Sequence, residues 1–353
     1  MILCRTPFRI SFFGGGTDYP DWYLKHGGSV ISTTINKYCY ISIRYLPPFF
    51  EHRIRLIYSK LELCQNYMEI KHPAVRETLR FMDINDGLEI HHDGDLPARS
   101  GMGSSSSFTV GLLNSLYALQ GKRVTKNTLA NESIQIEQNM IKETVGSQDQ
   151  TAASYGGLNK IVFQTNGEIE IQPVTISMLR INELDSHLML FYTGIMRTAS
   201  DVADSFVPNI LNKEKVLNKM HDLVDQSVTI LQENKSILEF GALLHETWEL
   251  KRQLSQKITN HIVDDLYKRA LKKGAIGGKI TGAGGGGFLL LFVPPSFQLQ
   301  VKKELKELLH VPFSFDFTGS RIIVYEPNLD EYNNLNKQEN NSYQTFRELN
   351  TIE

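Results

Sequence analysis

The chain has 353 residues, of which 41% are hydrophobic and 22% are charged, so it is long enough for one large globular domain or two ordinary ones. Its formal net charge of −2 provides no overall basic field of the kind that binds nucleic acid or an anionic membrane. No apolar run approaches the roughly 20 residues that cross a bilayer, and the N-terminus lacks a signal-peptide pattern. We therefore expect a cytoplasmic protein that holds any anionic ligand in a local site.

The number and spacing of the cysteines also fit a cytoplasmic protein. Cys4, Cys39 and Cys64 show no metal-ligand spacing, and their odd number leaves a thiol without a disulfide partner. We expect all three to be buried and reduced, as is usual in the cytosol. The sequence leaves the oligomeric state open, a homodimer included.

In the first half of the chain, β-branched and aromatic runs alternate with stretches of helical periodicity. We expect strands at 2–13, 29–35, 38–45, 88–92, 158–164 and 168–171, the last two joined by a turn at Asn166-Gly167. We expect helices at 74–82, 105–119 and 129–143, with Gly121 as the stop of the second one.

Long amphipathic segments follow a strand at 187–192, and this change of character places a domain boundary near residue 185. The expected helical segments are 199–207, 213–233, 236–255, 262–273 and 296–309, and the expected strands are 288–293, 313–317 and 321–325. The predicted division is therefore 1–185, 186–327 and a polar tail at 328–353. The tail is rich in Asn, Gln and Glu, and we expect it to be poorly ordered or loosely docked.

Residues 97–107 run Pro-Ala-Arg-Ser-Gly-Met-Gly-Ser-Ser-Ser-Ser directly into a helix. Small residues let backbone N–H groups approach an anion, and a helix N-terminus adds free donors and the positive end of a dipole. The pattern indicates a phosphate-binding loop, although a capped loop-to-helix junction has the same local signature.

The two common nucleotide-binding signatures are absent. No Gly-Lys-Ser or Gly-Lys-Thr occurs in the chain, so the P-loop signature is missing. Gly14-Gly15-Gly16 is followed by Asp18 and Tyr19 where a dinucleotide-binding fingerprint requires its third glycine.

Two further segments break ordinary secondary-structure rules, which is expected at functional sites. Residues 279–288 place five glycines in the six positions 282–287 before an apolar strand, and this is typical of close backbone approach or of a plain flexible loop. In residues 146–150, Asp149 lies between two glutamines, where it could meet a hydroxyl or a metal; a solvated turn is the alternative.

In order and spacing, three segments resemble the motifs of the GHMP kinases, the superfamily of galactokinase, homoserine kinase and mevalonate kinase. Residues 5–19 resemble the substrate-side motif, 97–107 the phosphate loop with Met102 in place of the usual leucine, and 279–288 the glycine-rich third motif. The resemblance implies an α+β fold of two domains, an N-terminal mixed α/β domain and a C-terminal ferredoxin-like α+β domain. The active site would lie in the cleft between them.

The resemblance also implies roles for individual residues and a requirement for ATP and Mg²⁺. Asp149 and Arg9 would be catalytic, Asp149 by accepting or orienting the proton of the acceptor hydroxyl and Arg9 as a cation near the transferring phosphoryl group. Ser105 and Glu137 would be the ligands of Mg²⁺, with the choice among the serines open because this loop has four. The nucleotide-binding residues would be Pro97, Arg99, Ser100, Gly101, Met102, Gly103, Ser104, Ser105 and Ser106. The substrate-binding residues would be Arg9, Gly15, Gly16, Thr17, Asp18, Arg197, Thr281, Gly282 and Gly284.

Within the superfamily, the Gly-Gly-Gly-Thr-Asp sequence at 14–18 and the Gln-Asp-Gln sequence at 148–150 resemble the heptose phosphate kinase branch. That branch implies transfer of phosphate from ATP to D-glycero-D-manno-heptose 7-phosphate, which gives the 1,7-bisphosphate for nucleotide-activated heptose and surface polysaccharide. The alternatives are a kinase of another sugar such as fucose or galactose, an ATP-dependent decarboxylase, and a sugar- and ATP-binding regulator without activity.

Overall fold

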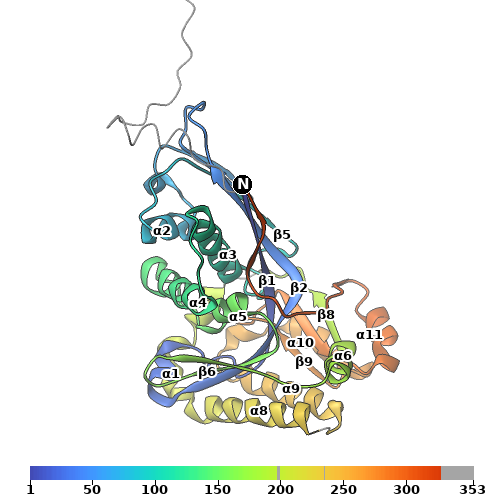
Figure 1. The fold of residues 1–353 in the computed structure, drawn as a ribbon. Helices are drawn as coiled ribbons and strands as arrows, with labels where there is room; N and C mark the ends of the chain where they lie inside the picture. Colours follow the sequence, from blue (N-terminus) through green and yellow to red (C-terminus); the bar gives the residue numbers. More distant parts are fainter. Residues whose placement is uncertain (197–198, 234, 327–353) are drawn as a thin grey trace, which may run out of the picture.

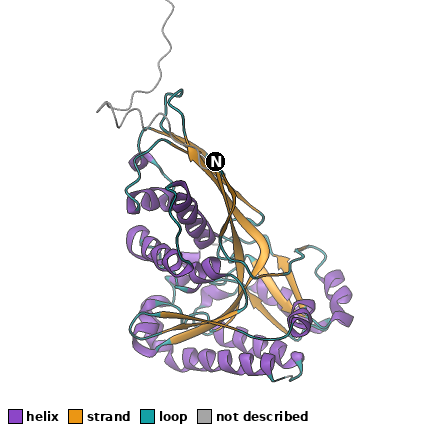
Figure 2. Cartoon of the chain, viewed as in Figure 1, coloured by secondary structure: helices purple, strands orange, loops and turns teal. Residues whose placement is uncertain are grey.

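A computed structural model describes residues 1–196, 199–233 and 235–326, which form two β-sheets with helices packed on them (Figure 1; Figure 2). The first sheet has nine strands and the order β13-β1-β2-β5-β3-β4, with β12 and β6 also pairing with β2 and β7 pairing with β6. The second has four strands in the order β11-β8-β10-β9. The structure confirms the expected α+β class.

Two long strands form the centre of the first sheet. β1 (Ile2–Phe13) is predominantly buried, and it pairs with β2 (Gly28–Tyr45) over nearly its whole length. The two strands predicted at 29–35 and 38–45 are one strand, because the chain continues its pairing with β1 through a register shift between Pro7 and Arg9. Such bulges re-aim a side chain, and this one lies next to Arg9.

The other strands of the first sheet are β3 (Ile54–Ile57), β4 (Leu61–Cys64), β5 (Leu88–Gly94), β6 (Asn159–Phe163), β7 (Ile169–Pro173), β12 (Phe315–Asp316) and β13 (Arg321–Tyr325). Its accompanying helices are α1 (Pro20–His26), α2 (Pro73–Phe81), α3 (Ser104–Leu119), α4 (Lys126–Gln135) and α5 (Gln148–Tyr155). The short 3-10 turn η1 covers Tyr67–Glu69. α3 packs directly on β1 and β2, so the helix that follows the phosphate loop rests on the strand that carries Arg9.

The helix expected at 129–143 begins earlier and changes type. α4 ends at Gln135, and the π-helical turn η2 (Ile136–Ile141) continues it. Both Ile136 and Glu137 are buried in this turn. Widened turns of this kind are frequent at functional sites, and this one carries a residue expected to bind Mg²⁺.

The second sheet is antiparallel and consists of β8 (Leu188–Tyr192), β9 (Gly277–Ile280), β10 (Phe288–Phe292) and β11 (Leu309–His310). The helices in this part of the chain are α6 (Met178–Ser186), α7 (Ala199–Ala203), α8 (Glu214–Gln232), α9 (Ile237–Arg252), α10 (His261–Lys272) and α11 (Gln298–Glu304), with the short 3-10 turns η3 (Val207–Lys213), η4 (Gln256–Ile258) and η5 (Pro295–Phe297). α9 packs on β9 and also reaches β1, and α8 packs on α9, β1 and β2, so these two helices connect the two sheets.

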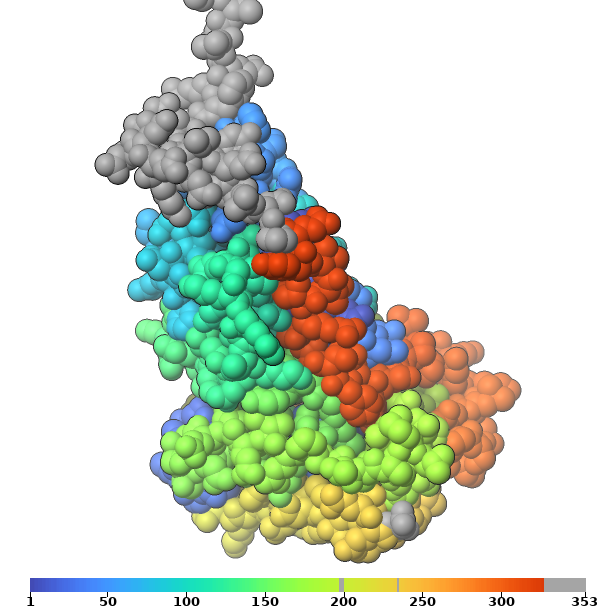
Figure 3. Space-filling model, in the orientation of Figure 1, coloured from blue at the N-terminus to red at the C-terminus, as the bar shows by residue number. Residues whose placement is uncertain are grey.

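The end of the described chain returns to the first sheet. β13 pairs with β1, and β12 pairs with β2, although both follow the second sheet in sequence. Figure 3 shows this segment, coloured orange-red, running along the surface of the N-terminal part of the molecule. Residues 315–325 therefore belong to the first sheet by their hydrogen bonds, although they follow the boundary that we predicted at 185; the division itself stays a prediction.

Other sequence expectations need correction. The helix predicted at 296–309 ends at Glu304, because residues 309–310 pair with β8 instead. Elements α1, α5, α6, β3, β4, β9 and β11 were not predicted. Arg197 and the polar tail from residue 328 lie outside the described residues.

The described part of the chain contains no helix with the length and apolarity that a membrane span requires. The cysteines Cys4, Cys39 and Cys64 are free thiols and buried, as expected.

Candidate active site

The two glycine-rich segments of the sequence are in direct contact. Gly101 has a φ of +79°, and a Cβ added there would stand 2.5 Å from the carbonyl oxygen of Thr281. In the other direction, a Cβ on Gly287 would stand 2.2 Å from the carbonyl oxygen of Ser100. Only glycine permits backbones to approach this closely, so the two loops form one wall.

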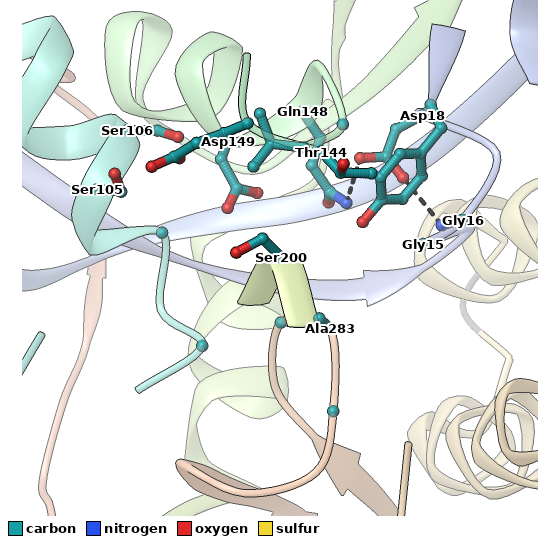
Figure 4. A pocket seen from close by; sticks show the side chains of 18 of the residues that line it. Gly15, Gly16, Asp18, Ser105, Ser106, Thr144, Gln148, Asp149, Ser200 and Ala283 are labelled. Atoms are coloured by element: carbon teal, nitrogen blue, oxygen red, sulfur yellow. Dashed lines mark hydrogen bonds between the residues drawn. The ribbon is translucent and has the colours of Figure 1, made fainter. Parts of the chain in front are cut away.

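A pocket opens at this wall and faces the N-terminus of α3. Its lining includes Gly101, Gly103 and the hydroxyl residues Ser104, Ser105 and Ser106. Because the first backbone N–H groups of a helix have no partner within the helix, this face of the pocket suits an anion such as phosphate. Figure 4 shows Ser105 and Ser106 on the first turn of α3, with Asp149 close to them.

A partly buried ion pair lies beside that helix end. The guanidinium of Arg9 donates from Nε to Oδ1 of Asp149 at 2.8 Å and from Nη2 to Oδ2 at 2.7 Å. Its Nη1 donates to the carbonyl oxygen of Gly101 at 2.7 Å, and the backbone N–H of Arg9 donates to the carbonyl of Met102. The side chain of Arg9 is 4% exposed and that of Asp149 is 25% exposed. The fork is therefore fixed by the protein, whereas the carboxylate opens to the pocket.

Gly103 of the phosphate loop lies next to this ion pair. A Cβ at Gly103 would lie 3.2 Å from Cγ of Arg9 and 3.4 Å from Oδ2 of Asp149. A group bound at the start of α3 would thus be adjacent to both charges.

At another part of the pocket, Asp18 is buried in a hydrogen-bond network. Its Oδ1 accepts from the backbone N–H of Gly16 at 2.9 Å, and its Oδ2 accepts from Nε2 of Gln148 at 2.8 Å (Figure 4). Burial raises the pKa of Asp18, the N–H of Gly16 opposes that shift, and the charge of Asp149 adds to it. The buried Oε1 of Gln148 has no hydrogen-bond partner, which leaves an acceptor for a ligand hydroxyl.

Glu137 lies behind the pocket, fully buried. Its Oε2 accepts from the hydroxyl of Ser106 at 2.9 Å and from the amide of Gln150, while its Oε1 has no partner. Burial raises the pKa of Glu137 to about 7, and the hydrogen bonds oppose the shift. The expected partner, Ser105, is exposed instead of contacting Glu137, so the hydroxyl nearest to this carboxylate belongs to Ser106.

A buried lysine also reaches the pocket. Lys251 in α9 is 5% exposed, lines the cavity, and donates from Nζ to the carbonyl of Gly282. Burial and, to a smaller extent, the nearby charge of Arg9 lower the pKa of Lys251 to about 8, against the opposing effect of the Asp18 and Asp149 carboxylates.

Most of the residues expected at the site line the pocket. These are Arg9, Gly15, Gly16, Asp18, Arg99, Gly101, Gly103, Ser104, Ser105, Ser106, Asp149, Gly282 and Gly284. The others in the described chain, which do not line it, are Pro97, Ser100, Met102, Thr17, Thr281 and Glu137. Thr17, for example, uses its hydroxyl to donate to the carbonyl of Gly14 at 2.8 Å, which holds the first motif in shape.

Several lining residues were not assigned from the sequence, among them Tyr19, Glu143, Ser200, Phe206 and Lys251. Lys251 had a detectable signal, because it falls on the buried stripe of α9 that also contains Leu244 and Trp248. A charged residue at such a position is unusual and marks a candidate. Among the described residues, no group of three or more His, Cys, Asp or Glu side chains is placed to hold a metal.

Two family models match the chain. The N-terminal domain model of the GHMP kinases matches residues 66–157, and the C-terminal model matches residues 228–310. The chain belongs to the GHMP kinases. These matches cover the phosphate loop and the glycine-rich loop of the GHMP kinase fold described above.

Individual relatives resemble this GHMP kinase over most of its length. The D-glycero-alpha-D-manno-heptose 7-phosphate kinase of Campylobacter jejuni is 28% identical, and the match covers 90% of this chain and 96% of the relative. The L-fucokinase/L-fucose-1-P guanylyltransferase of Bacteroides fragilis is 26% identical, over 87% of this chain and 36% of that protein. The crystal structure of a D-glycero-D-manno-heptose 1-phosphate kinase from Bacteroides thetaiotaomicron has a TM-score of 0.76 and 21% identity, over 92% of this chain and all of that one.

Proposed function

We propose that this phosphotransferase is a sugar kinase that transfers the γ-phosphoryl group of Mg-ATP to D-glycero-D-manno-heptose 7-phosphate, giving the 1,7-bisphosphate. The position of the Arg9–Asp149 pair beside Gly103 carries the proposal, because it places a carboxylate that can accept a hydrogen bond from a hydroxyl next to an anion-binding helix end. The likeness to the Campylobacter jejuni heptose 7-phosphate kinase supports the substrate.

Asp149 is proposed to hold the acceptor hydroxyl. Each carboxylate oxygen has two lone pairs, and Arg9 occupies one on each oxygen, so Asp149 can still accept a hydrogen bond from the sugar. The bidentate pair fixes the direction of that bond. Phosphoryl transfer depends mainly on such positioning and on charge stabilisation, and Arg9 provides a cation for the charge that develops on the phosphoryl oxygens.

Mg²⁺ fits the donors behind the phosphate loop. The orphaned Oε1 of Glu137 is a buried oxygen of the kind that this hard cation prefers, and the hydroxyls of Ser105 and Ser106 lie on the adjacent helix turn. When bound, the ion offsets negative charge on the phosphates. We propose that Ser106 orients Glu137 and that Ser105, together with the phosphate oxygens, completes the oxygen set.

The sugar is proposed to occupy the side of the pocket formed by Gly15, Gly16 and Asp18. Gln148 fits this assignment, since its amide fixes Asp18 and its Oε1 remains available for a hydroxyl. Arg197, outside the described residues, remains our proposed anchor for the phosphate already on the heptose, because arginine recognises phosphate with two parallel hydrogen bonds.

The test is a panel of acceptors with Mg-ATP, with ADP release as the readout. It includes heptose 7-phosphate, heptose 1-phosphate, unphosphorylated heptose, fucose and galactose, because the two heptose phosphate kinases named above differ in the position of the substrate's phosphate. Phosphorus NMR of the product then identifies the new phosphate.

We expect the highest kcat/KM with heptose 7-phosphate and a new resonance from an anomeric phosphate. A higher kcat/KM with fucose or galactose would overturn the heptose assignment but keep a sugar kinase. Binding of ATP and sugar without ADP release would instead indicate a regulator, and the proposed activity would be wrong.

A further inference from the structure

Lys251 is buried in a position that core packing alone does not explain. The buried face of α9 is otherwise largely apolar and includes Phe240, Leu244 and Trp248. Placing an ammonium on this face carries a large desolvation cost unless an anion or several acceptors compensate for it. The side chain, moreover, ends at the pocket and not in the core.

The described contacts compensate only in part. An ammonium has three donors, and among the described residues the carbonyl of Gly282 is the acceptor recorded within hydrogen-bond distance of Nζ. Asp18 and Asp149 exert favourable charge effects on Lys251, but their recorded hydrogen bonds are to other groups. The site therefore has donor capacity directed at whatever enters the pocket.

Lys279 provides an internal contrast. It is also buried, at 1% exposed, but its Nζ donates to the carbonyls of Ser11 and Phe12 at 2.9 and 3.0 Å, and it does not line the pocket. That lysine joins two segments of backbone and has a structural explanation. Lys251 differs in both respects.

Lys251 and Arg9 are held at neighbouring positions of the site. Arg9 donates to the carbonyl of Gly101, Lys251 donates to the carbonyl of Gly282, and these two glycines are in contact, since a Cβ on Gly282 would lie 2.6 Å from Cα of Gly101. The two cations are thus held at adjoining carbonyls of the two loops. Repulsion between them is tolerated where an anion is to be bound between them.

We propose that Lys251 is a ligand-contacting residue whose ammonium binds a phosphoryl dianion in the pocket. The proposal rests on the kinase function above. Two sources supply this chemistry: the γ-phosphoryl group of ATP, and the phosphate already carried by the sugar. At pH 7 the ammonium is the main form, because the pKa of Lys251, although lowered, is about 8.

The experiment uses K251M, which keeps most of the side-chain length and removes the charge. The matched control is K213M, because Lys213 also donates to a backbone carbonyl, that of Gln253 at 3.0 Å, but does not line the pocket. Calorimetry measures the affinities of both variants for ADP, for the β,γ-imido analogue of ATP, for heptose 7-phosphate and for unphosphorylated heptose. Thermal unfolding confirms that each variant is folded.

If Lys251 binds the γ-phosphoryl group, K251M loses about tenfold or more in affinity for the ATP analogue, while its affinity for ADP stays within about twofold. If it binds the sugar's phosphate, the same loss falls on heptose 7-phosphate and spares unphosphorylated heptose. Either selective loss, absent in K213M, supports the proposal. Equal weakening of all ligands, or none, would overturn it and leave Lys251 a structural residue.

Turnover by the wild-type protein distinguishes failure of the Lys251 assignment from failure of the proposed function. If wild type turns over heptose 7-phosphate and K251M binds all ligands normally, the lysine assignment alone fails. If wild type releases no ADP with any sugar, the proposed function fails, and the ADP comparison still tests Lys251.

Discussion

The two glycine-rich loops have similar composition, but Gly103 of one and Gly287 of the other serve different purposes. In the phosphate loop, Gly103 leaves space in front of Arg9 and Asp149. In the glycine-rich loop, Gly287 leaves space for the backbone of the other loop at Ser100. One glycine therefore keeps the site open for a ligand, and the other allows the wall of the site to be assembled. Composition alone does not distinguish these roles, but substitutions should.

The largest expected effect is on stability, at the second loop. Gly287→Ala would place a Cβ 2.2 Å from a backbone oxygen, in a residue whose φ is +88°. Since backbone must move to relieve that contact, we expect a loss of about 3 kcal/mol or more in the free energy of unfolding. Urea or thermal unfolding measures it. A stability within about 1 kcal/mol of wild type would show that the loops are not packed as described.

Gly103→Ala should instead affect activity more than stability. The φ of +74° costs an alanine about 1–2 kcal/mol, and the new methyl group crowds Arg9 and Asp149. We expect kcat to fall by about 10²-fold, measured as ADP release, because small displacements of reacting groups are costly.

Gly121→Ala is the control for that substitution. Its φ of +69° imposes a similar backbone strain, but nothing lies within 4 Å of the added Cβ. It should lose similar stability and keep its kcat. Equal losses of kcat in the two variants would remove the distinction between the loops.

Glu137 supplies an effect on stability that depends on pH. Its pKa is raised from 4.5 to about 7, so between these values the folded protein binds more protons than the unfolded chain. The stability contributed at low pH is therefore lost as the pH rises through this window, by about 3 kcal/mol at about 1.4 kcal/mol per pH unit. Glu137→Gln should lack this loss. The free energy of unfolding of the variant, relative to that of wild type, should therefore be higher at pH 7.5 than at pH 5. Parallel pH profiles would contradict the assignment.

Glu137 also allows a test of whether Mg²⁺ binds at this site. If the carboxylate of Glu137 meets Mg²⁺, binding of the Mg²⁺ complex of the ATP analogue at pH 6 should release a proton from wild type but not from Glu137→Gln. Calorimetry in buffers of different ionisation enthalpy measures that proton. The variant should also require more Mg²⁺ for activity. An unchanged Mg²⁺ requirement would exclude the ligand role.

The parts of the site that could be predicted are those with local signals. The phosphate loop, the glycine run and Asp149 interrupt regular patterns, and the structure brings all three together. Lys251 was missed although it continues the helical spacing of Phe240, Leu244 and Trp248, because a charge on an apolar stripe indicates a candidate without saying what it contacts. The choice between Ser105 and Ser106 depends on the rotation of a helix turn, which sequence periodicity does not resolve.

The fold shows the same limit. β1 and the helix after the phosphate loop follow from periodicity, whereas β9 contains Gly277 and Gly278, which have low strand propensity, and forms through its pairing with β10. The return of β12 and β13 to the first sheet is a pairing across some 280 to 320 residues of sequence, which no local pattern encodes.

The most direct test of the central claim is Asp149→Asn, assayed with Mg-ATP and heptose 7-phosphate beside wild type. The substitution keeps the shape but removes the charge and the proton-accepting oxygen. We predict that kcat falls by at least ~10²-fold, while the dissociation constants of both substrates change by a few-fold at most, because the lost interaction acts mainly in the transition state. A variant that released ADP as fast as wild type would contradict the account.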